Sequence, residues 1–277
     1  LACARRKSDP PEGQPVSVQY SLLGLLIYAS LAGHAAGFAA SLLRRRRAAM
    51  VLYNVAFGRA TGAFAVRWWQ VGHVPMQNLF EVFLTLAMLC RPISLLCRRL
   101  LNVGNEGVDM LIAAALLFPV GFVFGPEPRP LPPALRTPLF VPHVAAYVLA
   151  YVLMAKAAVQ AVRVLLPDKH IPAALTQAQR ATHHMICLGF PLLTAGLLLG
   201  AVWGKLAWGD YWNWDPKEMW SLAVWLTYVG YFHARALYGR ARPRLDAAWA
   251  LAGLALIVIT LLWVNLSRIF AGLHSYA

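Results

Sequence analysis

Residues 184–203 read His184-Met-Ile-Cys-Leu-Gly-Phe-Pro-Leu-Leu-Thr-Ala-Gly-Leu-Leu-Leu-Gly-Ala-Val-Trp203, a run of twenty residues without Asp, Glu, Lys or Arg. A helix rises about 1.5 Å per residue, so twenty residues cover the roughly 30 Å of a bilayer's hydrocarbon core. The run therefore predicts a membrane-spanning helix, and the Trp at its end begins a segment of unusual composition.

Seven further apolar runs surround it, and each is long enough to be read as a span. They cover residues 19–43, 48–67, 79–97, 108–125, 140–162, 219–238 and 247–266. The second contains Asn54 and Arg59, and the fourth is short and contains Pro119. The chain is 60% hydrophobic and only 13% charged, against roughly 25% charged in soluble domains. We predict an all-α, polytopic integral membrane bundle of about eight transmembrane helices, with residues 1–277 forming a single membrane domain.

The formal net charge of +14 admits a nucleic-acid binder, but the basic residues cluster in short loops between the apolar runs. That pattern sets membrane orientation, so we expect membrane lipid and no nucleic acid as a partner. With the N-terminus outside, the inner loops hold thirteen Lys and Arg residues and the outer segments hold eight. The prediction is a multi-pass protein of the bacterial inner membrane, with both termini on the periplasmic side.

The four cysteines have no CxxC spacing, so neither a disulfide framework nor a zinc site is expected. No cleavable signal peptide is expected either, because the first apolar run is long and ends in Arg44-Arg45-Arg46-Arg47.

Residues 203–220, an outer loop in this topology, contain five tryptophans and a tyrosine. Tryptophans also form belts at membrane interfaces, but a belt needs fewer rings than these. Indole rings offer large apolar faces and one donor each, which suits a large, flat, apolar ligand. The candidate ligand residues of this segment are Trp203, Trp208, Trp212, Trp214, Asp215 and Trp220.

Two histidines share the outer side with the tryptophans: His143 begins the fifth span, and His274 lies in the C-terminal tail. Neutral imidazole is a common axial ligand of haem iron, so the pair predicts a bis-histidine haem site. Each residue alone also reads as an exposed loop histidine. His233 lies late in the seventh span, where an ionisable residue is costly and marks a functional candidate. His34, in the inner half of the first span, is also explained by contact with headgroups.

The outer loop Gly72-His73-Val-Pro75-Met-Gln-Asn78-Leu-Phe-Glu81 has a structural explanation. Gly and Pro shape a turn, Asn78 caps the third span, and Glu81 complements the helix dipole. His73 as a ligand is the alternative. The loop from Pro126 to Pro142 is expected to be extended or partly helical, because its prolines disfavour a continuing helix.

The stretch Trp208-Gly-Asp-Tyr-Trp-Asn-Trp-Asp-Pro-Lys-Glu-Met-Trp220 resembles the WWD motif of haem-handling membrane proteins. Within that superfamily the chain most resembles the CcsA/ResC family of system II cytochrome c biogenesis. Further similarity lies in the 72–81 stretch, in Val-Pro-His143, in His233-Ala-Arg235 and in Gly272-Leu-His274-Ser-Tyr.

The resemblance implies a subunit of a cytochrome c synthetase that handles haem b as substrate. Haem would be held in the membrane by His233 and then at the WWD segment by His143 and His274, where thioethers form with a CxxCH apocytochrome c. A ResB/CcsB-type membrane protein would be the partner; a second intramembrane histidine would come from it or from His34. No nucleophile or acid–base pair is evident, so we expect binding, orientation and iron ligation within a holocytochrome c synthase (haem lyase) complex. The alternatives are a CcmC-type haem exporter, disfavoured by eight spans, and a transporter or scaffold that binds no haem.

Overall fold

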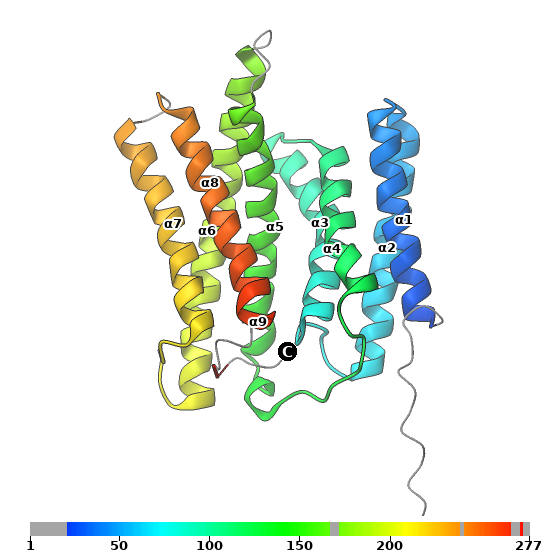
Figure 1. Cartoon of the computed structure of the whole chain (residues 1–277), viewed down its shortest axis with the longest axis vertical. Helices are drawn as coiled ribbons and strands as arrows, with labels where there is room; N and C mark the ends of the chain where they lie inside the picture. Colours follow the sequence, from blue (N-terminus) through cyan, green and yellow to red (C-terminus); the bar gives the residue numbers. More distant parts are fainter. Residues whose placement is uncertain (1–20, 167–171, 239–240, 267–271, 274–277) are drawn as a thin grey trace, which may run out of the picture.

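A computed structural model describes residues 21–166, 172–238, 241–266 and 272–273, which form a helical bundle with no strand in these ranges (Figure 1). All eight predicted helices are present in it. They are α1 (Leu22–Leu42), α2 (Arg46–Val71), α3 (Leu79–Leu101), α4 (Glu106–Phe122), α5 (Phe140–Leu165), α6 (Pro172–Trp208), α7 (Pro216–Tyr238) and α8 (Pro243–Val258). A π-helical turn, Ile259–Trp263, and the short α9, Val264–Leu266, continue α8.

Six helices in the described part of the chain are long and apolar enough to cross a membrane: α1, α2, α3, α5, α6 and the segment from Pro243 to Leu266. The other two pack in the same bundle. α4 has only 17 residues, and α7 mixes tyrosines, tryptophans and polar residues with its apolar ones. The protein is thus a polytopic helical membrane bundle, as predicted.

The bundle has two halves joined through α3 and α5 (Figure 1). α1, α2, α3 and α4 pack on one another at one edge, and α5, α6, α7 and α8 form the other half, in which α5 and α6 have the most extensive contact. Glycines let these two helices approach closely, since a Cβ on Gly196 would lie 3.0 Å from the Tyr147 ring. The loops α2–α3, α4–α5 and α6–α7 all lie at one end of the bundle (Figure 1).

Local sequence signals explain where the helices begin and end. Asn78 caps α3 by accepting from the Glu81 N–H at 3.0 Å, and Gly72 ends α2 in the left-handed conformation at φ 72°. The proline-rich loop is irregular apart from the 3₁₀ turn Pro133–Leu135, as expected.

Buried ion pairs tie the helices together. Arg67 and Glu81, both almost fully buried, bond at 2.8 Å between α2 and α3. Arg67 is the last residue of the predicted run 48–67, but α2 continues to Val71 and buries its guanidinium. Lys156 bonds to Asp109 and Arg235 to Asp246, which gives two further ion pairs between helices. Burying a charge is costly unless it is paired, so each pair fixes the register of two helices.

Candidate functional site

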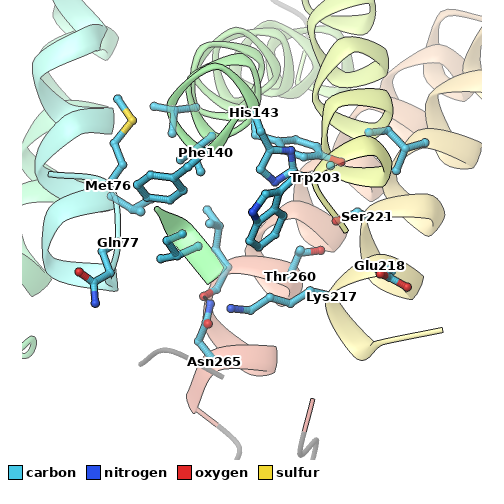
Figure 2. A pocket seen from close by; sticks show the side chains of 18 of the residues that line it. Met76, Gln77, Phe140, His143, Trp203, Lys217, Glu218, Ser221, Thr260 and Asn265 are labelled. Carbon is cyan, nitrogen blue, oxygen red and sulfur yellow. Dashed lines mark hydrogen bonds between the residues drawn. The ribbon is translucent and has the colours of Figure 1, made fainter. Parts of the chain in front are cut away.

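A cavity of about 200 Å³ lies at the loop end of the bundle, between α3, α5, α6, α7 and the π-helical turn after α8 (Figure 2). Its walls are mainly aromatic and aliphatic, with a few polar groups. Residues that line it include Met76, Gln77, Phe140, His143, Tyr147, Tyr151, Trp203, Trp212, Lys217, Ser221, Thr260 and Asn265.

His143, in the first turn of α5, points into this cavity beside Trp203 (Figure 2). Its Nδ1 lies 2.8 Å from the carbonyl oxygen of Gly196 on α6. A carbonyl only accepts, so Nδ1 carries the proton and Nε2 carries the lone pair of the neutral ring. This is how metal-ligating histidines are oriented, by a hydrogen bond from the nitrogen that does not ligate.

Packing fixes the same ring from the other sides. The Trp203 ring lies 5.7 Å from it at an interplanar angle of 31°, and the Tyr147 ring meets it edge-on at 5.2 Å. A Cβ on Gly200 would lie only 2.6 Å from Cε1 of His143. Residue 200 must therefore be glycine for the imidazole to occupy this position.

The tryptophans of the segment divide into two groups. Trp203 and Trp212 line the cavity; Trp203 is 3% exposed and donates from Nε1 to the Ala134 carbonyl at 2.8 Å. Trp208 packs against Trp203 from behind, with ring centres 4.8 Å apart. Trp214, 69% exposed, and Trp220 do not line the cavity. Only part of the predicted aromatic platform therefore faces one space.

The predicted loop 203–220 is longer than the connection between α6 and α7 in the structure. α6 continues to Trp208 and α7 begins at Pro216, so the connection is 209–215. The reason is a capping box with Pro at the first helical position: Asp215 Oδ1 accepts from Lys217 N at 2.9 Å, and Glu218 Oε2 accepts from Asp215 N at 3.1 Å.

Asp215 also holds the C-terminal segment. Its Oδ2 accepts from the backbone N–H of Leu273 at 2.6 Å, and a Cβ on Gly272 would lie 2.3 Å from the same oxygen. The carboxylate, 5% exposed and predicted to contact haem, thus has backbone partners in α7 and in the tail. His274 follows Leu273 directly in the chain but lies outside the described residues.

The loop before α3 supplies the opposite wall through Met76, Gln77 and Asn78. Glu81 holds this loop, because its Oε2 accepts from the Gln77 N–H at 2.9 Å while Oε1 pairs with Arg67. Arg67 in turn donates to the carbonyls of Pro126 and Glu127, which anchors the proline-rich loop beside it. His73, the alternative ligand, does not line the cavity; its Nδ1 lies 3.1 Å from the Val74 carbonyl oxygen.

Sequence reasoning missed several lining residues. Tyr147 and Tyr151 follow His143 at intervals of four, a spacing that puts all three on one face of α5. Three polar lining residues lie within predicted apolar runs, so their position in a cavity could not be inferred: Ser221, Thr260 and Asn265. The π-helical turn that places Thr260 in the wall has no signal in the sequence that we recognise; such turns are frequent at functional sites.

Lys217 contributes an amino group to the cavity wall, as does the side-chain amide of Asn265, and both are labelled in Figure 2. Burial lowers the pKa of its ammonium to about 8, and the nearby Asp215 carboxylate partly opposes that shift. Lys205, the other lysine of residues 203–220, is exposed, does not line the cavity, and donates to the Gly209 carbonyl.

His233 and His34 lie away from this cavity. His233 is 17 residues beyond Pro216 along α7, roughly 25 Å at 1.5 Å per residue. Its side chain is exposed on the bundle surface, with Nδ1 3.0 Å from the Val229 carbonyl. His34 is 1% exposed, faces Tyr53, and holds Nδ1 2.9 Å from the Ser30 carbonyl. The structure brings neither together with His143.

This arrangement can hold a flat aromatic molecule against Trp203 and Trp212, offer one imidazole lone pair to it, and place a cation at one end. No three His, Cys, Asp or Glu side chains within the described ranges are grouped as a site for a bare metal ion.

The sequence model of the cytochrome c assembly protein family matches residues 72–271, which contain every described residue of the cavity wall. The chain is a member of this family of membrane proteins in cytochrome c biogenesis. Among its relatives it is similar to the cytochrome c biogenesis protein CcsA of Prochlorococcus marinus (strain MIT 9313), with 33% identity over 258 residues, covering 78% of this chain and 80% of that one.

Other relatives give the same result. CcsA of Synechococcus sp. (strain CC9311) is 33% identical over 262 residues, covering 78% of this chain and 83% of that one. CcsA of Chlamydomonas reinhardtii is 32% identical over 227 residues, covering 76% and 63%. The chain therefore belongs to the CcsA family that its WWD segment suggested.

A solved structure named cytochrome c haem lyase CcmF has the same fold, with a TM-score of 0.67 and 20% identity. The similarity covers 92% of this chain and 48% of that one, so the present chain spans about half the length of that protein.

Proposed function

We propose that this protein is the membrane subunit of a cytochrome c synthetase, which binds haem b as substrate in the cavity beside the WWD segment and presents it to apocytochrome c. The observation that carries the proposal is the orientation of the His143 ring. It is oriented by the Gly196 carbonyl with Nε2 as the lone-pair nitrogen, and it lies against Trp203 in a cavity with aromatic walls.

The second axial ligand in this proposal is His274. Its support is the hydrogen bond from Leu273 N to Asp215, which holds the adjacent residue of the tail at the start of α7. Because Lys217 and Glu218 in that first helical turn line the cavity, the tail reaches the chain at the cavity's edge. Asp215 then acts as the residue that positions the tail, and its own contact with haem is not required.

The remaining wall residues bind and orient the substrate. Trp203 and Trp212 exclude water from its faces, and the Lys217 ammonium suits a haem propionate. The bound haem supplies the vinyl groups, and addition of a substrate thiol across each vinyl double bond needs no nucleophile from this chain. The two thiols come from the CxxCH motif of the apocytochrome.

The delivery step of the proposal uses His233 and a ResB/CcsB-type membrane protein. His233 is exposed on α7, far from the cavity. A haem bound there would need contacts on its other face from a protein outside this chain. A transmembrane helix of the partner would supply those contacts and a second axial ligand for the haem iron. His34 is buried and suits this role less well.

The cavity is assigned to the periplasmic side of a bacterial inner membrane. The support is the distribution of Lys and Arg, which favours an outer position for the loop end of the bundle. A reporter fused after Arg180 is expected to read as cytoplasmic, and a periplasmic signal there would invert the assignment.

The test is the visible spectrum of the full chain purified with its ResB/CcsB-type partner from haem-replete cells. We expect a Soret band of bis-histidine character that is lost from the outer site in His143→Ala and partly restored by imidazole. His184→Ala, on an exposed histidine of α6, is the matched control. A wild-type complex without haem would overturn the proposal and favour the scaffold alternative, whereas the CcmC-type alternative predicts haem transfer without thioether formation.

A further inference from the structure

Trp214 has a backbone conformation that bulky residues rarely adopt. Its φ is 57°, in the left-handed region, where the Cβ of an L residue comes too close to the backbone. Gly209, at the other end of the same connection between α6 and α7, adopts φ 93° without that clash because it has no Cβ. The connection thus has a strained backbone at Trp214 and an unstrained one at Gly209.

The place of Trp214 in the chain does not explain its conformation. The other two described non-glycine residues with positive φ are Arg44, just after the end of α1, and Asn102, the C-cap of α3. A left-handed residue is common directly after a helix, where it closes the last turn. Trp214 instead precedes a helix, so this ordinary reason does not apply to it.

Neighbouring hydrogen bonds hold the strained residue in place. Glu218 Oε2 accepts from the backbone N–H of Asn213 at 2.8 Å and from that of Asp215 at 3.1 Å, which fixes the backbone on both sides of Trp214. The Trp214 side chain contributes little burial to offset the strain, because it is 69% exposed. Strain that the surrounding structure maintains is concentrated at functional sites, so the exposed ring calls for a functional explanation.

The Trp214 ring lies at the edge of the cavity. It meets the ring of Trp212, which lines the cavity, edge-on at 6.1 Å. In the proposed reaction the two thiols of the apocytochrome must come within bonding distance of the vinyl groups of a haem bound in that cavity. The polypeptide around the CxxCH motif therefore has to lie across the cavity's edge, where Trp214 presents its ring.

From this geometry we propose that Trp214 binds the apocytochrome polypeptide next to its CxxCH motif and does not contact the haem. Tryptophan is enriched among the residues that dominate the binding energy of protein interfaces. A backbone that already holds the ring in place lowers the entropy cost of binding. The identity of the polypeptide as apocytochrome rests on the proposed function.

A place among lipid headgroups is the ordinary reason for an exposed tryptophan in a membrane protein. Trp69, 90% exposed in the last turn of α2, fits that description and has a helical backbone. Contact with headgroups gives no reason for a left-handed backbone at Trp214. Trp69 therefore serves as the matched control for the loss of an exposed indole ring.

The experiment measures the binding of a fluorescently labelled apocytochrome c peptide that contains CxxCH. The full chain is used in complex with its ResB/CcsB-type partner in phospholipid nanodiscs. Trp214→Gly should weaken peptide binding by about tenfold or more and leave the Soret band unchanged. Its Tm should stay the same or rise, because glycine adopts φ 57° without strain. Trp214→Phe, which keeps an aromatic ring, should retain most of the binding, and Trp69→Ala all of it.

Wild-type peptide affinity in Trp214→Gly would overturn the proposal, and it is the result expected if the ring lies among headgroups. An equal loss of affinity in Trp69→Ala would overturn it too, and loss of the Soret band in Trp214→Gly would assign the ring to the haem instead. The proposed function is tested separately, because peptide binding is measured directly. A wild-type complex that binds the peptide but contains no haem would refute haem binding and leave the Trp214 contact standing.

Discussion

The regions around His143 and His233 present their imidazoles in different ways. His143 bonds to a carbonyl of a neighbouring helix, is flanked by Trp203 and Tyr147, and faces a cavity. His233 bonds to a carbonyl of its own helix and is exposed on the bundle surface. One region is a cavity lined by several helices of this chain, whereas the other is part of the exposed surface of α7.

From this difference we expect the two histidines to depend on other proteins to different degrees. Ligand sites are most effective when neighbouring groups orient the ligating residue before binding. His143 meets that condition through α6, whereas His233 meets it only in part, through Val229. We therefore expect the outer site to bind haem in the isolated chain and the His233 site to require the partner.

The largest effect is expected from His143→Ala. Its removal deletes a ligand outright, so haem affinity at the outer site should fall by more than the roughly 10–100-fold that loss of an orienting partner costs. His233→Ala should leave haem in the isolated chain unchanged and reduce it only in the complex with the partner. Haem titration of both variants, with and without the partner, measures this; equal losses in the isolated chain would refute the distinction.

Gly200→Ala tests the preorganisation of the outer site without touching a ligand. The added Cβ would lie 2.6 Å from Cε1 of His143, so the ring must move away from the Gly196 carbonyl. We expect haem affinity to fall by about 10–100-fold and the Soret band to shift, while the helix itself tolerates alanine well.

Gly58→Ala is the matched control, because a Cβ there meets nothing within 4 Å in the described structure. It should leave the haem titration unchanged. Wild-type affinity in Gly200→Ala would mean that the orientation of His143 does not matter for binding.

Asp215→Ala tests the link between the WWD segment and the tail. Loss of the α7 cap should cost about 0.5–2 kcal/mol in stability, and loss of the bond to Leu273 N should also weaken the His274 ligand. Glu218→Gln is the control, since it keeps an acceptor for the Asp215 N–H in the capping box and leaves in place the Asp215 carboxylate that bonds to Leu273 N. Thermal unfolding measures the loss of the cap, and the low-spin fraction of the Soret spectrum measures the His274 ligand. An unchanged spectrum in Asp215→Ala would mean that the tail does not contribute to haem binding.

Most of the fold could be predicted because an apolar run long enough to cross a bilayer predicts a helix. All eight helices overlap the predicted runs, and the Asn78 cap and the Glu81 position follow from local chemistry. Helix ends were predicted less closely. The predicted run began at residue 219 because it followed apolar composition, whereas the Asp215-Pro-Lys-Glu218 capping box starts α7 at Pro216.

The site was harder to predict because it depends on contacts between distant segments. His143 and Trp203 could be singled out as residues, but the Gly196 carbonyl and the gap at Gly200 exist only once α5 and α6 pack. Asp215 illustrates the same limit, since its bond to Leu273 joins positions 58 residues apart. Thr260 lines the cavity because it lies in a π-helical turn, which the spacing of apolar residues in the sequence does not predict.

The smallest expected effect concerns pH, and it belongs to the outer region alone. Burial lowers the pKa of Lys217 to about 8 from its ordinary value near 10.5, so the free protein loses this cation as the pH rises through 8. A bound propionate favours the charged amine, so haem affinity should fall a few-fold between about pH 7 and 9. Lys217→Arg keeps the charge throughout this range and should flatten the profile, whereas Lys217→Met should lower affinity at pH 7 and remove the dependence. Haem titrations of the isolated chain at several pH values measure this, and a slope that persists in Lys217→Met would assign the titration to another group.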